Sequence, residues 1–275
     1  LQENVVLENW SAEALNTAPN SQNEIHGDRI AQEFGFEGGL VPGVTISAYL
    51  VPPAILQWGV KWLERGTAQV KVSSPLYDGE RFEVSMRETS ERSFEADLWR
   101  PNGVKSATAT VGVPDHLPAA PIRRQDPIAE PDFRGPAATF EVWRELKASG
   151  CKAFRYYWDG GDGELKIYLR DQAALPALLQ PEDGGFANMS FLLGCSNWIL
   201  ASNAYMNPWV HLETRSQNFS PVPRNTHVIA EMQVLDYFEK KGHQFIDVDV
   251  DLYDERSGTC YMTTMLRAIF RLRGA

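Results

Sequence analysis

The sequence predicts an α+β protein built from two copies of one unit, an apolar helix followed by an antiparallel meander of strands. The first copy starts with the apolar run at residues 44–63, and strand-like segments continue from there to residue 113. The second copy has a helical candidate at about residues 186–205, again followed by strand-like segments. Because the same order of elements occurs twice, we expect a duplicated fold.

The strands of the first copy are separated by clear turn signals. Residues 67–88 predict two strands around a Pro-Leu-Tyr-Asp-Gly turn, and residues 93–113 predict a hairpin with Pro-Asn-Gly at its tip. Pro52 and Pro53 interrupt the apolar run, and proline inside a helix removes a hydrogen bond and clashes with the preceding turn. We therefore expect this helix to be kinked or restarted there and to end near Arg65 and Gly66.

The second copy repeats the plan with strands at 214–238, 242–254 and 259–272, separated by turns at 240–242 and 254–258. Between the copies, residues 115–138 are rich in proline and charge, which is typical of a linker. A short helix in 140–150 and a strand-like segment with a glycine-rich turn in 154–171 would open the second copy. These boundaries predict an N-terminal unit at 1–114, a linker at 115–138 and a C-terminal unit at 139–275.

Composition limits the class of protein. The chain has 275 residues, a formal net charge of −10 and a pI near 5.1, which argue against a nucleic-acid or anionic-membrane partner. The three cysteines lack metal-ligand spacing, so no metal and no cofactor is expected. No apolar stretch is long enough to span a membrane, and no signal peptide is recognisable, so we expect a cytoplasmic location.

Residues 20–44 hold the strongest chemical signal in the chain. Asp28 is predicted as the N-cap of a short helix at about 29–34, and His26 comes just before it. Glycines at 35, 38 and 39 end this helix, and Gly43 then precedes the apolar run. Backbone N–H groups at such a helix start can hold a developing oxyanion, and a neutral imidazole beside them would complete a small catalytic site.

This segment resembles the MaoC-like, or R-specific, enoyl-CoA hydratases, whose signature runs roughly D-x-N-P-x-H-x-D, a short helix, and G-F-x-G-x-[IV]-x-H-G. The chain departs from the signature at three positions, with Ser21 at the catalytic aspartate, Glu24 at the proline and Pro42 at the second histidine. The resemblance implies a double hotdog, two antiparallel sheets each wrapped around a long helix, that acts on an acyl-CoA or acyl-carrier thioester. The matching residues are Asn23, His26, Asp28, Gly35, Phe36, Gly38, Val41 and Gly43.

By this resemblance, His26 positions water or takes a proton, and the Gly43 N–H polarises the thioester carbonyl. Ser21, Asn23 and Glu24 are the candidates to take part in catalysis in place of the absent aspartate, and Val41 and Pro42 are substrate-binding candidates. The counterpart of this segment in the second copy, residues 171–188, has no histidine, so we expect one site per chain, with the second copy shaping the pocket.

The second copy carries a row of polar residues at alternating positions, which would share one face of a strand. Such a row could line a polar groove, bind a CoA phosphate through Arg215, or form a solvated face of the sheet. The row consists of His211, Glu213, Arg215 and Gln217.

Three functions remain open at this level. The first is an acyl-thioester hydratase or dehydratase, a lyase. The second is a thioesterase that activates water with Glu24, or with Glu213 and Gln217. The third is a protein that binds acyl-CoA or a small lipid without catalysis. A duplicated fold of this kind contains its own internal pseudo-dimer, so either a monomer or a homodimer is expected.

Overall fold

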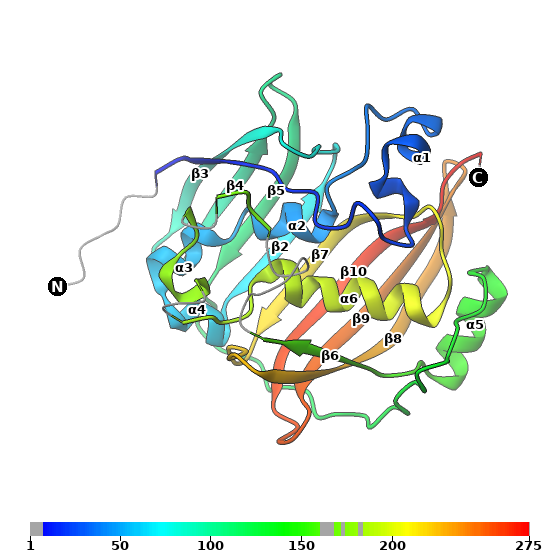
Figure 1. Cartoon of the computed structure of the whole chain (residues 1–275). Coiled ribbons are helices and arrows are strands. Elements are labelled where there is room, and N and C mark those ends of the chain that lie inside the picture. Colours follow the sequence, from blue (N-terminus) through cyan, green and yellow to red (C-terminus); the bar gives the residue numbers. More distant parts are fainter. Residues whose placement is uncertain (1–7, 160–167, 172–173, 181–183, 275) are drawn as a thin grey trace.

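The chain forms one ten-stranded sheet with its two central helical regions on the same face, as Figure 1 shows. The computed structural model describes residues 8–159, 168–171, 174–180 and 184–274. Every strand pairing is antiparallel, and the spatial order is β1-β3-β4-β5-β2-β7-β10-β9-β8-β6. Read outward from the centre, β2-β5-β4-β3-β1 and β7-β10-β9-β8-β6 are the same arrangement, so the duplication predicted from the sequence is present.

The first half contains these elements: β1 Trp10–Glu13, η1 Glu24–His26, α1 Asp28–Glu33, α2 Gly43–Ala48, α3 Pro52–Trp58, α4 Val60–Arg65, β2 Thr67–Val72, β3 Arg81–Ser90, β4 Ser93–Trp99 and β5 Lys105–Gly112. The second half contains α5 Phe140–Ser149, β6 Phe154–Trp158, η3 Ala177–Leu179, α6 Met189–Asn203, β7 Val210–Asn218, β8 Thr226–Lys240, β9 His243–Asp254 and β10 Cys260–Arg271. The strands of the predicted hairpins correspond to these strands, and the predicted turns lie between them. The glycine-rich turn expected after β6 falls at 160–163, outside the described residues.

The two central helices differ in continuity. In the first half, the helix is interrupted before Pro52 as predicted, and it is interrupted a second time, so that three short helices, α2, α3 and α4, replace one long helix. Pro52 and Pro53 begin α3, and Gly59, with a φ of +56°, separates α3 from α4. In the second half, α6 is continuous and begins where the Asn188 side chain accepts the Phe191 N–H at 3.0 Å.

The predicted two sheets are joined edge to edge. Antiparallel pairing of β2 with β7 links the halves, with Thr67 opposite Gln217 and Lys71 opposite Glu213. The apolar core lies between this continuous sheet and the helices, and α2 packs against α6 across the middle of the molecule. The junction therefore places the N-terminal end of α2, at Gly43, beside the second half.

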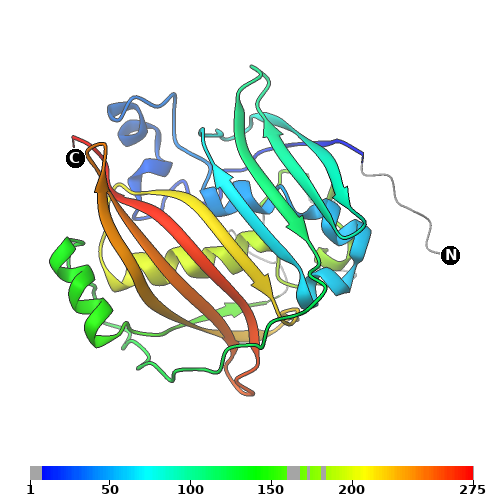
Figure 2. The same cartoon turned by 180° about the vertical axis from the view of Figure 1, so that it is seen from behind.

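Residues 129–138 of the linker bond to Ala153 and Tyr205, beside β6 and α6. The part before them, residues 115–126, runs along the outer face of the second half of the sheet, which Figure 2 shows from behind. It is held there by Glu231 of β8, whose fully buried carboxylate accepts the backbone N–H groups of Arg124 and Asp126 at 2.7 and 3.2 Å. The Arg123 guanidinium also binds Glu231 at 3.1 Å. Strand β5 ends at Gly112 and α5 begins at Phe140, and the domain boundaries at 114 and 138 stay predictions.

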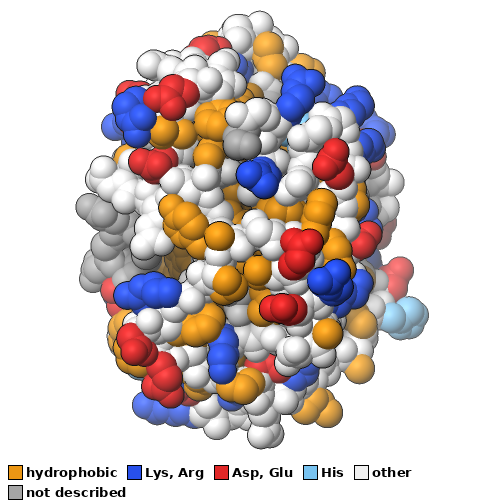
Figure 3. Space-filling model, turned by 90° about the vertical axis from the view of Figure 1, so that its right-hand side faces the viewer, with side chains coloured by type: hydrophobic (Ala, Val, Ile, Leu, Met, Phe, Trp, Pro, Cys, Tyr) orange, Lys and Arg blue, Asp and Glu red, His pale blue; other side chains and the backbone are white. Residues whose placement is uncertain are grey.

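The surface and the helices carry two further findings. On the face shown in Figure 3, acidic and basic side chains are interspersed with hydrophobic ones, so the net charge of −10 is not gathered there as a single acidic patch. Among the described residues, no helix is both long enough and apolar enough to cross a membrane.

Candidate functional site

A short helix and a glycine turn form the loop that carries His26. Helix α1 ends at Glu33, and Gly35 then takes a φ of +85°, a left-handed conformation that suits glycine. The N–H groups of Gly35 and Phe36 donate to the carbonyls of Gln32 and Ala31, each at 3.0 Å. This pattern is a Schellman motif, which turns the chain back toward its start.

The returning chain lies directly against His26. Leu40 donates its N–H to the Ile25 carbonyl at 3.1 Å, and a Cβ on Gly39 would lie only 2.2 Å from the His26 carbonyl oxygen. Only glycine allows this approach. Asp28 does not cap α1 as predicted: Gly27 is the N-cap, and the Asp28 carboxylate instead accepts the Gly39 N–H at 2.8 Å, which holds the turn closed.

The same turn sets the tautomer of His26. The Leu40 carbonyl lies 2.7 Å from His26 Nδ1, so Nδ1 carries the proton and donates it, and Nε2 is left as an acceptor. Burial lowers the pKa of His26 from 6.5 to about 4, an effect partly opposed by the bond to Leu40. The imidazole is therefore neutral at physiological pH.

Asn23 connects this loop to the second half. Its side-chain amide donates to the Trp209 carbonyl at 2.9 Å and accepts the Trp209 N–H at 3.0 Å, and the residue is buried. The same amide lies 3.3 Å from His26 Nε2, at the long end of hydrogen-bond distances. Trp209 thus holds Asn23 in place beside the His26 ring.

The other two candidates for the missing aspartate lie differently from what the resemblance implies. The Glu24 carboxylate accepts from the Asn207 amide at 2.7 Å and lies 3.6 Å from Arg29, so it is not hydrogen-bonded to His26. The Ser21 hydroxyl donates to the Asn23 carbonyl at 3.1 Å. Within the described part of the chain, the hydrogen-bond partners of the His26 ring are Leu40 and Asn23, and neither is a carboxylate.

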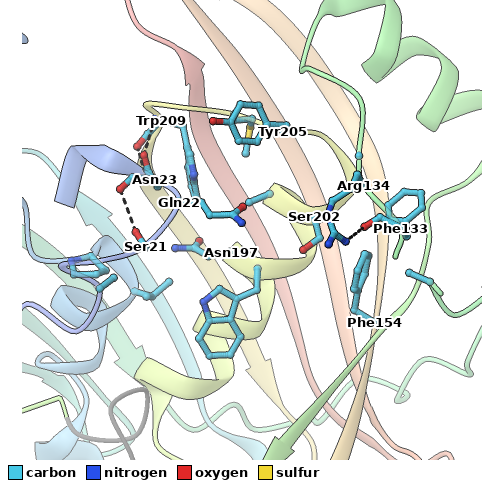
Figure 4. Close-up of a pocket in the computed structure, with 18 of the residues that line it drawn as sticks. Ser21, Gln22, Asn23, Phe133, Arg134, Phe154, Asn197, Ser202, Tyr205 and Trp209 are labelled. Atoms are coloured by element: carbon cyan, nitrogen blue, oxygen red, sulfur yellow. Dashed lines mark hydrogen bonds between the residues drawn. The ribbon is translucent and has the colours of Figure 1, made fainter. Parts of the chain in front are cut away.

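Three cavities border His26. One, of about 900 Å³, is lined by residues of the α1 loop and by Tyr77 and Arg100, and the other two share lining residues and meet at His26. The larger of these two, of about 830 Å³, lies between the Ser21–Asn23 segment, α6 and the linker, and Figure 4 shows Asn197 pointing from α6 toward Ser21. The smaller, of about 250 Å³, is lined mainly by apolar side chains of both halves, among them Phe36, Ile46 and Leu212. Four residues line both cavities and form the partition between them: Asn23, His26, Asn197 and Trp209.

The remaining candidates from the motif lie around this partition. Pro42 lines the larger cavity, whereas Val41 and Gly43 line the smaller one. Gly43 begins α2, and since Thr45 and Ile46 already donate to the Pro42 carbonyl, the N–H groups of Gly43 and Val44 point out of the helix end. The structure therefore brings His26 and Gly43 to one small cavity.

The polar row on β7 does not share one face. The pairing of β7 with β10 shifts register between Arg267, opposite Glu213, and Ala268, opposite His211, which leaves Leu212 as the extra residue of a β-bulge. The bulge turns His211 to the helix side, where the residue is only 6% exposed. The prediction that the row shares one face was wrong because residues alternate between faces only along an unbroken strand, and the bulge breaks this one.

Arg215 lies away from both cavities. Its exposed guanidinium binds Glu213 at 3.1 Å on the outer side of the sheet, so the structure does not support the predicted contact with a CoA phosphate. Gln217 donates to the carbonyls of Arg65 and Asn218, at 3.0 and 2.8 Å, and likewise lines neither cavity. The two residues proposed with a thioesterase, Glu213 and Gln217, are thus not part of the His26 site.

His211 and Asn197 belong to the site although the sequence did not indicate it. His211 Nδ1 lies 3.0 Å from Asn197 Oδ1, and burial lowers the pKa of His211 from 6.5 to about 3. The His211 ring also packs against Gly43 so closely that a Cβ there would lie 2.7 Å from Cδ2. The spacing of Asn197 within its helix carries no signal for this role, since α6 is buried on nearly all sides.

Comparison with known proteins places this geometry on a known fold. The structure is similar to a conserved hypothetical protein of Mycobacterium tuberculosis that has a double hotdog fold, with a TM-score of 0.57, 9% identity and 95% of each chain covered. The fold is a double hotdog. The sequence itself matches no family model and no curated protein.

Two other similar structures are a dehydratase domain and a protein assigned as a thioesterase. The dehydratase domain of a mycocerosic acid synthase-like polyketide synthase has a TM-score of 0.53 at 15% identity, over 98% of this chain and 94% of the domain. A protein assigned as a thioesterase II, from Thermobifida fusca, has a TM-score of 0.52 at 15% identity, over 96% of this chain and 93% of the other. At these identities the likeness concerns the fold.

Proposed function

We propose that this double hotdog binds an acyl thioester and adds water to an enoyl thioester, or removes it, at His26. The observation that carries the proposal is the His26 imidazole, which is neutral, is fixed through Nδ1 to the Leu40 carbonyl, and lines both the larger and the smaller cavity, with Nε2 3.3 Å from the Asn23 amide. A positioned neutral imidazole is the usual general base of enzymes.

The reaction follows from this placement. His26 Nε2 takes a proton from water while the water oxygen bonds to Cβ of the enoyl thioester. The π electron pair of the Cα–Cβ bond then moves toward the carbonyl, and the resulting enolate takes the proton from the imidazolium at Cα. The N–H of Gly43, at the start of α2, is placed to stabilise the charge on the carbonyl oxygen.

The two cavities differ in polarity and size in the way that the two parts of such a substrate differ. The larger cavity, of about 830 Å³, is lined by polar groups of Ser21, Gln22 and Asn197 and suits the pantetheine arm of CoA or of a carrier protein. The smaller, of about 250 Å³, is mainly apolar and suits the acyl group. Since an apolar cavity of about 150 Å³ admits benzene, this one holds a group of roughly ten carbon atoms at most.

Hydration is favoured over hydrolysis by the placement of the carboxylates. Glu24 is held by Asn207, and Glu213 by Arg215, so the residues that would serve a thioesterase are paired outside the site. An imidazole and a helix start supply a general base and an oxyanion site, which the addition of water to an activated double bond can use.

The test is a panel of trans-2-enoyl-CoA and saturated acyl-CoA esters of increasing chain length. We expect loss of the enoyl absorbance with short and medium chains, little release of free thiol, and a fall in hydration of about 10²-fold or more in His26→Ala. His116→Ala, which changes an exposed histidine of the linker, is the matched control. Equal activity of the two variants, or release of thiol without loss of the enoyl group, would show that the proposed reaction is wrong.

A second variant examines the change at position 21. Ser21 stands where the resembling hydratases have their catalytic aspartate, and it lines the larger cavity beside His26. We expect Ser21→Asp to increase the rate of hydration, because the new carboxylate can share proton transfer with His26. A rate unchanged by Ser21→Asp would mean that the site works without a carboxylate.

A further inference from the structure

The site contains a second histidine whose polar atom has no partner. His211, from β7 of the second half, is only 6% exposed and lines the smaller cavity together with His26. Its Nδ1 faces Asn197 Oδ1 at 3.0 Å, so Nδ1 carries the proton and Nε2 is an unprotonated acceptor. Among the residues that the structure describes, none is hydrogen-bonded to His211 Nε2.

Local packing holds this ring in place. Asn197 orients the ring from α6. Gly43 packs against the other side of His211, so closely that a Cβ on Gly43 would lie 2.7–2.9 Å from the Cβ, Cγ and Cδ2 atoms of His211. Two neighbouring side chains already have partners, since Asn23 binds Trp209 and His26 binds Leu40. A buried acceptor without a partner is costly and uncommon, and a ligand that brings a donor removes that cost.

We propose that His211 Nε2 accepts a hydrogen bond from the oxygen that is added to or removed from the substrate, and so selects acyl groups with a hydroxyl at Cβ. This assignment rests on the proposed function. In hydration, the attacking water gives one proton to His26 and keeps the other, which it donates to His211. The product hydroxyl retains that second proton, so His211 holds the 3-hydroxyacyl group without changing its own protonation state.

The ligand class that follows is a 3-hydroxyacyl thioester of short or medium length. A saturated acyl group of the same length fills the cavity but leaves His211 Nε2 unpaired. Sites that hydrogen-bond a substrate hydroxyl discriminate strongly against analogues that lack it, for this reason. We expect the 3-hydroxyacyl form to bind about tenfold more tightly, equivalent to ~1.4 kcal/mol.

Binding of two thioethers that cannot react tests the assignment separately from catalysis. The probes are S-(3-hydroxyoctyl)-CoA and S-octyl-CoA, measured by calorimetry with wild type, His211→Phe and His227→Phe. Phenylalanine keeps the packing of the ring and removes the acceptor. His227, on β8, lines neither cavity and is the control for the substitution. We expect the preference for the hydroxyl probe in wild type and His227→Phe, and its loss in His211→Phe.

A second measurement covers the case in which His211→Phe does not fold. In wild type labelled with ¹⁵N-histidine, the hydroxyl probe should shift the Nε2 resonance of His211 and the octyl probe should leave it nearly unchanged. A preference that survives in His211→Phe, or equal shifts with both probes, would overturn the assignment.

The outcomes for function and for His211 are separable. Preference for the hydroxyl probe without any turnover would refute the hydratase and support the role of His211. Hydration by a wild type that shows no preference would support the hydratase and refute the role of His211. A protein that binds neither probe would refute the hydratase and the role of His211 together.

Discussion

Replacing Gly43 with alanine tests the contact between the two halves at the site. A Cβ at this position would lie 2.7 Å from Cδ2 and 2.9 Å from both Cβ and Cγ of His211. Ordinary contacts begin at 3.4 Å, so the nearest atom is 0.7 Å too close. Since Asn197 and the strand β7 hold His211, the ring has little room to move away.

The cost follows from overpacking a filled interior. Such insertions destabilise by about 1–3 kcal/mol, and the better helix propensity of alanine returns up to ~1 kcal/mol, so we expect a net loss of about 1–2 kcal/mol. Gly27→Ala is the matched control, because its new Cβ would meet nothing closer than the Glu24 carbonyl oxygen at 3.5 Å and its φ is −101°. That change should be neutral or stabilise the protein by ~0.4–1 kcal/mol.

Denaturant unfolding of the two variants measures the difference. In a His211→Ala background, Gly43→Ala should cost less, because two of the three close His211 atoms, Cγ and Cδ2, are gone and the two changes are coupled. If Gly43→Ala is as stable as Gly27→Ala, or if its cost is the same with and without the His211 ring, the two halves do not meet at this contact and the composite site is wrong.

Three further predictions concern other parts of the molecule. The His26 pKa of about 4 and the His211 pKa of about 3, against 6.5 when free, mean that below pH 6.5 the unfolded chain binds protons that the folded one does not; each histidine should then lower the unfolding free energy by ~1.4 kcal/mol per pH unit down to about pH 4 in denaturant titrations, and His26→Gln should remove about half of the combined slope. Asn23→Ala leaves the Trp209 N–H and carbonyl unpaired and should cost about 1–3 kcal/mol, so an unchanged thermal midpoint would contradict the pairing. Glu231→Ala removes the buried anchor of the linker and should cost about 3 kcal/mol or more and speed proteolysis there, whereas Glu239→Ala, at the exposed end of the same strand, should change neither.

The secondary structure and the duplication could be predicted from local signals. Alternating apolar residues, glycine and asparagine turns and the Pro52-Pro53 pair act within a few residues of one another, and the strands and the break in the first helix lie where these signals put them. The loop around His26 is local for the same reason. Gly35 and Gly39 permit the turn that brings the Leu40 carbonyl back to the imidazole of His26.

The predictions for the polar row and for Glu24 failed for one physical reason. A change of strand register or of hydrogen-bond partner is not contained in any local sequence pattern. The row at 211–217 alternates in the sequence, but the bulge at Leu212 sends His211 inward while Arg215 stays on the outer face. Glu24 lies two residues before His26 in the chain, yet Asn207, far away in the sequence, holds its carboxylate.

The sequence by itself therefore determined the two helix-plus-meander units and one half of the site, because the hydrogen bonds that orient His26 are made within a single loop. Only the tertiary structure decided that the half-sheets join through β2 and β7 and that Asn197 and His211 complete the cavity from the other half. Those contacts join residues more than a hundred positions apart, and they depend on how two packed layers meet.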